Sequence, residues 1–324
     1  MQIVAEMGST TRGNLEVAKS LARNAKFAEV DNVKFILASP DHLIADKSIK
    51  YGNKNLYQVI KNYQLTDKEY LELAQFCRDI DLPYFATCCS PKDVRLAELM
   101  GVSMYKIGGW DIRNYYVARE IALKNRPIQI DIGAAIYGEL MNLLNFIYSI
   151  NPNADISLIY ESHGQPDEYN LQAITYLKDR MKKPVGFSAN ESATTADLLA
   201  VGLGISSIEK RIKIDSSSKH HHEDKALSPK DFKDWVKLMR QAESMLGVKE
   251  LRPSMKDIAD KNLYYTSLCF SKDIKKGDTI TRNHLCCRRP GHGISPYFDY
   301  LFIGKKAIED FKENTLITYN VIGG

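Results

Sequence analysis

A cluster of charged residues follows a short apolar run in the second half of the chain. Residues 205–208 have the pattern of a buried strand, and Glu209, Lys210 and Arg211 come directly after it, with Asp215 a few positions later. An α/β barrel gathers its reactive side chains at the carboxyl ends of its parallel strands. The sequence therefore predicts that this cluster lies at the mouth of a barrel, after its last strand.

The earlier apolar runs of the chain also end in polar or charged residues. Side chains alternate along a strand, so only some of these residues can face the mouth of a barrel. The candidates, in chain order, are Glu6, Lys34, Thr87, Lys106, Asp131, Glu161, Ser188, Glu209 and Lys210. Several of them converging on one edge would form a site.

Two of these lysines, Lys34 and Lys106, interrupt otherwise apolar runs, VKFIL and MYKIG. An ammonium group buried there without an anionic partner would be strongly unfavourable. Two or three lysines at one mouth, with Lys210 as the third, suggest an anionic ligand such as a phosphate or a carboxylate. Glu6 and Asp215 are either acid/base groups or the counter-ions of these lysines, and the sequence leaves both roles open.

A strand followed by a helix recurs eight times, which is typical of parallel βαβ units. The predicted strands are 2–6, 32–37, 83–87, 103–107, 127–132, 155–160, 185–188 and 205–208. The loop after the first strand, GSTTRG, lacks the GxGxxG pattern of a dinucleotide-binding fold. We therefore predict a (β/α)8 TIM barrel over residues 1–246. The insertion at 38–65 is expected to cover the mouth, and Ser228 to cap the last helix.

The pattern changes after residue 246. Residues 247–262 have the composition of a polar linker, and short β-like runs such as YTSLCF and TLITYNVI occupy residues 263–324. These features predict a second, small and mostly β domain after the barrel.

Composition limits the classes of partner. The net charge of +4 is too small to indicate a nucleic-acid-binding or membrane-binding surface. No apolar run is long enough to span a membrane, and the first residues lack the features of a signal peptide. We expect a cytoplasmic protein that acts on small molecules.

The cysteines and a run of three histidines are residue types that can bind metal ions, but neither pattern indicates a metal site. The six cysteines include no CxxC motif, so we expect reduced, packed thiols. His220, His221 and His222 are adjacent in the segment KHHHEDK. Because adjacent loop residues rarely all bind one ion, a solvated loop is favoured over a metal site.

Five motifs together resemble one known family. They are AEMGSTTRG (5–13), KFI (34–36), KIGG (106–109), IEKR with its following aspartate (208–215), and DIKKGDTIT with RRPGHGISP in the tail. In this order they resemble the sialic acid synthases, which comprise N-acetylneuraminate synthase and its legionaminic and pseudaminic relatives. The resemblance covers essentially the whole chain. It implies a barrel followed by an SAF, or antifreeze-like, domain.

The resemblance also implies a reaction. These enzymes condense phosphoenolpyruvate with the open-chain aldehyde of an N-acetylated aminosugar, releasing phosphate and giving a nonulosonic acid. By position, Lys34, Lys106 and Ser188 would hold phosphoenolpyruvate, while Glu6 and Lys210 would line the reacting centre.

The sugar acceptor has two implied contacts. Asp215 would bind the acceptor within the same barrel. In a homodimer the small domain would reach over the partner barrel and supply Arg289 to the sugar.

The chain departs from this family at the metal site. The family binds a divalent metal ion, Mn²⁺ or Mg²⁺, through two histidines, one in a GYSDH motif and one in IEKH. Those positions are Asn190 and Arg211 here, so both ligand histidines are absent. An amide and a permanently charged guanidinium do not replace two imidazoles as metal ligands.

The phosphate site also departs from the family. Asp131 stands in place of the serine of an STGM turn, and Gly109 in place of a serine after the KI pair. Thr10 and Thr11 replace an Asn-His pair in the first loop.

Three interpretations remain open at this stage. The first is a metal-independent synthase in which Arg211 supplies the positive charge and Asn190 stands at a former ligand position. The second is a family enzyme with a changed donor or acceptor, because Asp131 opposes a plain phosphate site. The third is a non-catalytic relative that binds a sugar or a partner.

Overall fold

A computed structural model describes residues 1–215, 220 and 222–322 of the chain. The chain forms two compact units, Met1–Gly247 and Val248–Gly324. The segment predicted as a linker, 247–262, contains much of a helix, α11 (Met255–Tyr264), which the sequence analysis did not anticipate. Its first turn carries a capping box in which Ser254 and Asp257 bond to each other's backbone amides.

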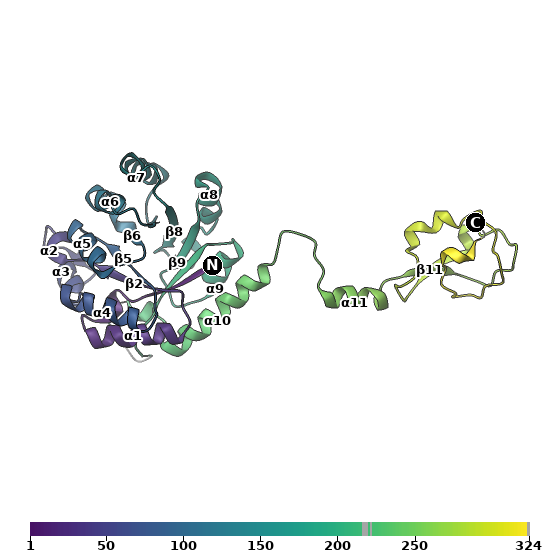
Figure 1. The fold of residues 1–324 in the computed structure, drawn as a ribbon, viewed down its shortest axis with the longest axis horizontal. Coiled ribbons are helices and arrows are strands. Elements are labelled where there is room, and N and C mark those ends of the chain that lie inside the picture. Colours follow the sequence, from purple (N-terminus) through teal and green to yellow (C-terminus); the bar gives the residue numbers. More distant parts are fainter. Residues whose placement is uncertain (216–219, 221, 323–324) are drawn as a thin grey trace. The chain divides into compact units, whose positions relative to one another are not determined.

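The first unit is a closed barrel of parallel strands, which confirms the predicted TIM barrel (Figure 1). Its strands are β1 (Gln2–Glu6), β2 (Asn32–Leu37), β5 (Tyr84–Cys88), β6 (Tyr105–Ile107), β7 (Ile128–Asp131), β8 (Ile156–Ser162), β9 (Val185–Ala189) and β10 (Ser207–Arg211). They pair in the order β1-β10-β9-β8-β7-β6-β5-β2, and β2 closes the barrel against β1. All their carboxyl ends therefore lie at one rim.

Helices surround these strands (Figure 1). They are α1 (Leu15–Phe27), α4 (Asp67–Asp79), α5 (Pro91–Met100), α6 (Tyr115–Ala122), α7 (Tyr137–Ile150), α8 (Gln172–Met181), α9 (Thr195–Gly202) and α10 (Pro229–Leu246). The Ser228 side chain accepts a hydrogen bond from the Asp231 amide and caps α10, as the sequence predicted. The apolar core of this unit lies largely between the strands and the inward faces of these helices.

A small subdomain follows β2. It consists of α2 (Pro40–Leu43), a hairpin of β3 (Lys50–Tyr51) and β4 (Lys54–Asn55), and α3 (Leu56–Lys61). Ala38, Ile60 and Cys89 are buried in an apolar cluster that is separate from the barrel core. Ala38 directly follows β2 and Cys89 directly follows β5, so the cluster lies at the carboxyl ends of these strands. This subdomain is the insertion that the sequence placed between the second strand and its helix.

The second unit is built on an antiparallel pair, β11 (Ser267–Phe270) and β12 (Leu285–Arg288). Loops and isolated bridges complete it, and Leu268, Phe270, Ile280, Phe302 and Ile317 are buried in its core. The predicted small, mostly β domain is therefore present. Short 3-10 turns occur at Ser9–Thr11, Gly109–Asp111, Pro166–Glu168, Glu223–Lys225, Arg282–His284, Pro296–Leu301 and Tyr319–Val321.

Candidate active site

The charged cluster of the last strand is divided between two environments. β10 begins at Ser207, two residues later than predicted, so Glu209, Lys210 and Arg211 belong to the strand itself. Alternation then places Glu209 and Arg211 on the interior side, in register with Val4 and Glu6 of β1. Lys210 must face the opposite side, toward the helices.

The structure corrects the position expected for Lys210. Its Nζ lies 2.6 Å from Asp197 Oδ2 and 2.7 Å from the Ala193 carbonyl oxygen. Trp235 Nε1 donates a second hydrogen bond to Asp197, at 2.8 Å. Both charged side chains are completely buried, and Lys210 is absent from the walls of the interior cavity. Lys210 therefore joins β10 to α9 and α10 instead of meeting a ligand at the mouth.

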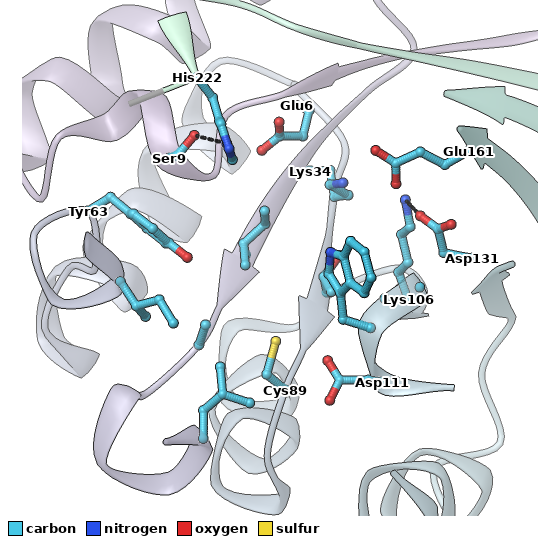
Figure 2. A pocket seen from close by; sticks show the side chains of 18 of the residues that line it. Glu6, Ser9, Lys34, Tyr63, Cys89, Lys106, Asp111, Asp131, Glu161 and His222 are labelled. Carbon is cyan, nitrogen blue, oxygen red and sulfur yellow. Dashed lines mark hydrogen bonds and ion pairs between the residues drawn. The ribbon is translucent and has the colours of Figure 1, made fainter. Parts of the chain in front are cut away.

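A cavity of about 570 Å³ opens at the carboxyl ends of the strands (Figure 2). Its charged side consists of Glu6, Lys34, Lys106, Asp111, Asp131, Glu161, Glu209 and Arg211. Its apolar side consists of Ile36, Ala38, Leu43, Ile44, Leu56, Val59 and Ile60. Most of the apolar residues come from the subdomain after β2, so the prediction that this insertion covers the mouth is confirmed.

Lys34 and Lys106 share this cavity, as the sequence predicted, and both meet a carboxylate. Lys34 Nζ lies 2.5 Å from Glu209 Oε1. Lys106 Nζ lies 3.2 Å from Glu209 Oε2 and 3.0 Å from Asp131 Oδ2. The two ammonium groups are thus neutralised by acidic side chains from β7 and β10, and they do not stand as free charges.

These pairs determine the ionisation of Glu209. Burial alone would raise its pKa, but the ammonium groups of Lys106 and Lys34 lower the pKa of Glu209 to about 2. Burial also disfavours the charged form of Lys106, yet Glu209, Asp131 and Glu161 raise its pKa above the ordinary value. Lys106 is therefore an ammonium ion at neutral pH, which suits it to electrostatic work and not to nucleophilic attack.

Arg211 occupies the interior next to the first strand. Its Nε lies 2.7 Å from Glu6 Oε2, and its Nη1 donates to Asn190 Oδ1. The other Glu6 oxygen, Oε1, accepts from the Gly8 amide at 2.6 Å. Glu6, which accepts from the Gly8 amide, and Asn190 therefore hold the Arg211 guanidinium in place at the cavity wall.

This arrangement does not fit the divalent metal ion that the resemblance implies. Asn190 and Arg211 stand at the positions of the two ligand histidines, and the asparagine oxygen already accepts from the guanidinium. A divalent cation placed between them would lie against a permanent positive charge. Within the described part of the chain, no three or more His, Cys, Asp or Glu side chains are arranged to hold a metal ion.

Glu161 forms a second acidic group beside the lysines (Figure 2). It shares a hydrogen bond with Asp131, and His163 Nε2 lies 3.3 Å from its Oε1. Burial and the neighbouring Asp131 charge raise the pKa of Glu161 to about 8. Glu161 is therefore protonated at neutral pH and can donate a proton inside the cavity.

The two departures from the family at the phosphate site, Gly109 and Asp131, lie in or next to loops that contact each other. A Cβ added at Gly109 would lie 2.9 Å from the Gly133 Cα and 3.2 Å from Asp131 Oδ1. Gly133 has a φ of 49°, a left-handed conformation, and its amide donates to Asp131 Oδ1 at 3.0 Å. Asp131 and its turn fill the space in which a serine at 109 would stand.

The remaining predicted residues occupy different places. Ser188 is buried on β9, in register with Glu161 and Glu209, and so faces the interior without lining the cavity. Asp215 Oδ2 lies 3.9 Å from Arg12 Nη2, is half exposed and does not line the cavity. Arg289 belongs to the second unit, where its guanidinium lies 5.6 Å from the Tyr264 ring centroid.

Several residues of the cavity were not among the site residues predicted from the sequence. His222 lines the cavity and lies 3.3 Å from Ser9 Oγ, so this member of the histidine run is not simply a solvated loop residue. His220 does not line the cavity, and His221 lies outside the described residues. The Trp110 and His163 rings are in contact, with their centroids 5.0 Å apart and their planes tilted by 43°. For Trp110 and His163 the only sequence signal was their position shortly after an apolar run, whereas His222 was visible as a member of the histidine run.

Comparison with known proteins agrees with this architecture. A model of the NeuB family matches residues 21–251, and a model of the SAF domain matches residues 265–322. The chain belongs to the NeuB family. It is 28% identical to the N,N'-diacetyllegionaminic acid synthase of Campylobacter jejuni, over 97% of this chain and 98% of that protein.

Other members of the family are similar over nearly the full length. The pseudaminic acid synthase of Campylobacter jejuni is 28% identical over 96% of this chain and 93% of its own. The human N-acetylneuraminate-9-phosphate synthase is 24% identical over 99% and 92%. These family members are sialic acid synthase-type enzymes, which supports an enzymatic role for this chain.

Solved structures share the fold. The sialic acid synthetase of Leptospira borgpetersenii, in complex with citrate, has a TM-score of 0.73 and 22% identity over 80% of this chain and 89% of its own. A putative spore coat polysaccharide biosynthesis protein E of Chromobacterium violaceum has a TM-score of 0.81 and 15% identity over 100% and 99%. None of the helices in the described residues is long and apolar enough to cross a membrane.

Proposed function

We propose that this NeuB family member is a carbon–carbon bond-forming synthase of nonulosonic acids. It joins phosphoenolpyruvate to the open-chain aldehyde of an N-acetylated aminosugar, and it does so without a divalent metal ion. The names of the relatives support the class of product. The observation that carries the metal-independent mechanism is the interior guanidinium of Arg211, held by Glu6 and Asn190.

In this proposal Arg211 polarises the acceptor aldehyde. A guanidinium aimed at the carbonyl oxygen stabilises the negative charge that develops there when the carbon–carbon bond forms. Glu6 and Asn190 fix the orientation of the guanidinium before the substrate arrives, so little reorganisation is needed during the reaction. Lys34 and Lys106 face the same cavity and orient the acidic donor.

The reaction also requires proton transfers. The methylene carbon of phosphoenolpyruvate attacks the aldehyde carbon, and the aldehyde oxygen gains a proton to become a hydroxyl group. Water then adds to the second carbon of the donor and loses both of its protons, one to the base and one to the departing phosphate, which leaves a 2-keto acid. Glu161, protonated at neutral pH, is the proposed acid, and the Glu6 carboxylate is the proposed base.

Phosphate release tests this proposal. Wild-type protein in EDTA should release phosphate from phosphoenolpyruvate with N-acetylmannosamine or a diacetylated bacillosamine-type sugar. Arg211→Ala should lose on the order of 10² in rate or more. Arg113→Ala is the matched control, because Arg113 is exposed and pairs with Glu139 outside the cavity. Activity that appears only after Mn²⁺ is added would contradict the metal-independent mechanism.

A second candidate is a family enzyme with a changed donor, and the Lys106–Asp131 contact specifically favours it. A phosphate bound at Lys106 would compete with an aspartate that belongs to the chain. This candidate predicts no phosphate release with any acceptor, together with thermal stabilisation by an anion of lower charge such as pyruvate. Stabilisation by phosphoenolpyruvate, with turnover, would exclude it.

The resemblance adds a proposal for the assembly. We propose a cytoplasmic homodimer in which the small domain covers the barrel of the other subunit and Arg289 contacts the acceptor sugar there. The resemblance alone supports roles for Asp215 in acceptor binding and for Ser188 in donor binding, since neither residue lines the cavity. The third interpretation, a non-catalytic sugar-binding relative, would be supported by sugar binding without turnover under any of these conditions.

A further inference from the structure

Two cysteine side chains of the small domain touch across a β ladder. Cys269 of β11 lies directly opposite Cys286 of β12 in the antiparallel register. Their Sγ atoms are 3.3 Å apart. Neither residue belongs to the barrel, and the pair takes no part in the proposed reaction.

The backbone already has the spacing that a disulfide requires. Opposed residues of an antiparallel pair have Cα atoms about 4.5 to 5.5 Å apart. Disulfides join Cα atoms separated by about 4.4 to 6.8 Å. Forming the bond would bring the sulfurs closer by on the order of 1 Å, a shift that side-chain rotation can supply.

The two thiols differ in accessibility. Cys269 is fully buried, whereas Cys286 is partly exposed. The Arg288 guanidinium interacts with the Cys286 sulfur. Burial, with the neighbouring Cys286, raises the pKa of Cys269 to about 11. Cys286 is thus the thiol that an oxidant reaches first, and Cys269 is placed to react second.

We propose that Cys269 and Cys286 form a reversible redox site that closes to an intramolecular disulfide on reaction with a low-molecular-weight disulfide. The Cys286 thiolate attacks one sulfur of that disulfide, forms a mixed disulfide and releases one small thiolate. Cys269 then attacks the Cys286 sulfur, loses its proton and releases the second small thiol. Two protein thiols are oxidised, and one small disulfide is reduced to two thiols.

The link would tie the segment ahead of Arg289 to β11. β12 ends at Arg288, and Arg289 is the next residue. Cys269 and Cys286 are 17 positions apart, so the disulfide would close a short loop. Closing this loop restricts the unfolded chain and should raise the melting temperature of the small domain by ~4 °C or more.

The experiment treats the full chain with oxidised glutathione and then alkylates the remaining thiols in denaturant. Peptide mass spectrometry should find Cys269 joined to Cys286, with four of the six cysteines alkylated. Dithiothreitol should restore all six, and the oxidised protein should melt at a higher temperature. Glutathione attached to Cys287 alone, a Cys286–Cys287 link or no change in thiol count would each overturn the proposal.

Serine variants give matched controls. Cys287→Ser removes the exposed neighbour and should leave formation of the Cys269–Cys286 link unchanged. Cys269→Ser should stop at the mixed disulfide, with one glutathione held on Cys286. Equal thiol loss in Cys269→Ser and wild type, without that mixed disulfide, would show that the reactive cysteines lie elsewhere.

Discussion

Lys106 Nζ lies 3.0 Å from Asp131 Oδ2, so the ammonium group that the chain could offer to an anionic ligand already has a carboxylate partner. Glu209 approaches the same nitrogen at 3.2 Å. Any anionic ligand at this place must compete with two acidic side chains. The charge state of position 131 should therefore control what this cavity accepts.

Replacing Asp131 should strengthen the binding of phosphorylated ligands. Asp131→Ser removes the competing charge and introduces the hydroxyl that the family has at this position, so phosphoenolpyruvate should bind tenfold tighter or more, about 1.4 kcal/mol. Isothermal titration calorimetry measures this change. Asp131→Asn separates the effect of charge from that of the hydroxyl. Weaker binding in both variants would mean that Asp131 itself contacts the ligand.

Adding the second family serine should cost stability. A side chain at Gly109 would press on the Gly133 backbone, so Gly109→Ser in the Asp131→Ser background should lose about 1 to 3 kcal/mol. Urea denaturation of the single and double variants gives this difference. Gly138→Ser is a control, because nothing lies within 4 Å of the Cβ position there.

Glu161 should give the protein a distinctive pH dependence. Its pKa is about 8 in the folded state, well above that of an exposed glutamate, about 4.3, so the folded state retains a proton that the unfolded state releases. This contribution to stability is complete below about pH 4.3 and is lost as the pH rises through about 8. Glu161→Gln should flatten the decline between these values, by up to ~1 kcal/mol per pH unit. Unfolding curves at several pH values measure it, and parallel slopes in variant and wild type would contradict the assignment.

The sequence predicted the barrel and most of the cavity, and its errors have physical causes. Lys34 and Lys106 stood out because a charge inside an apolar run needs an anionic partner. The partners, Glu209 and Asp131, come from strands far along the chain, and no local pattern could pair them. Lys210 was misplaced because Glu209 and Lys210 were both expected at the mouth after the strand had ended. β10 continues to Arg211, and two neighbouring residues of one strand face opposite sides.

The helix α11 was missed for a different reason. Its surroundings are polar and none of its residues is buried, so it lacks the strong apolar face that reveals most helices. The pairing of Ser254 with Asp257 was a readable signal of its start. The distance between Gly109 and Gly133 could not have been predicted, because it depends on how two loops meet after folding.

Lys210 should matter for stability more than for chemistry. Lys210→Met leaves Asp197 charged and buried, with Trp235 as its remaining side-chain donor among the described residues, which should cost ~3 to 5 kcal/mol. The fraction that folds should keep its KM for the donor. Guanidinium unfolding and steady-state kinetics measure the two effects. A large rise in KM with unchanged stability would mean that Lys210 contacts the ligand.

The proposed exchange of Arg289 between subunits predicts complementation. Arg289→Ala and Arg211→Ala should each be inactive but folded. After the two variants are dissociated and mixed, some dimers should contain one subunit of each. In these mixed dimers, the barrel with an intact Arg211 receives an intact Arg289 from its partner. Activity should then return to roughly a quarter of wild type, as random pairing into dimers requires. The absence of any recovery, with dimers demonstrated by ultracentrifugation, would show that each chain supplies both residues to its own site.

Restoring the two family histidines should change the dependence on metal. Asn190→His with Arg211→His removes the guanidinium from beside Glu6 and places two imidazoles on the adjacent strand ends. Imidazoles bind divalent transition metals, so Mn²⁺ should bind the double variant and not the wild type. Calorimetry with Mn²⁺ alone measures this binding without relying on turnover. The single variant Asn190→His is the control, because the remaining Arg211 charge should still repel the ion. Binding of Mn²⁺ by the wild type with similar affinity would mean that the guanidinium does not exclude a metal from this cavity.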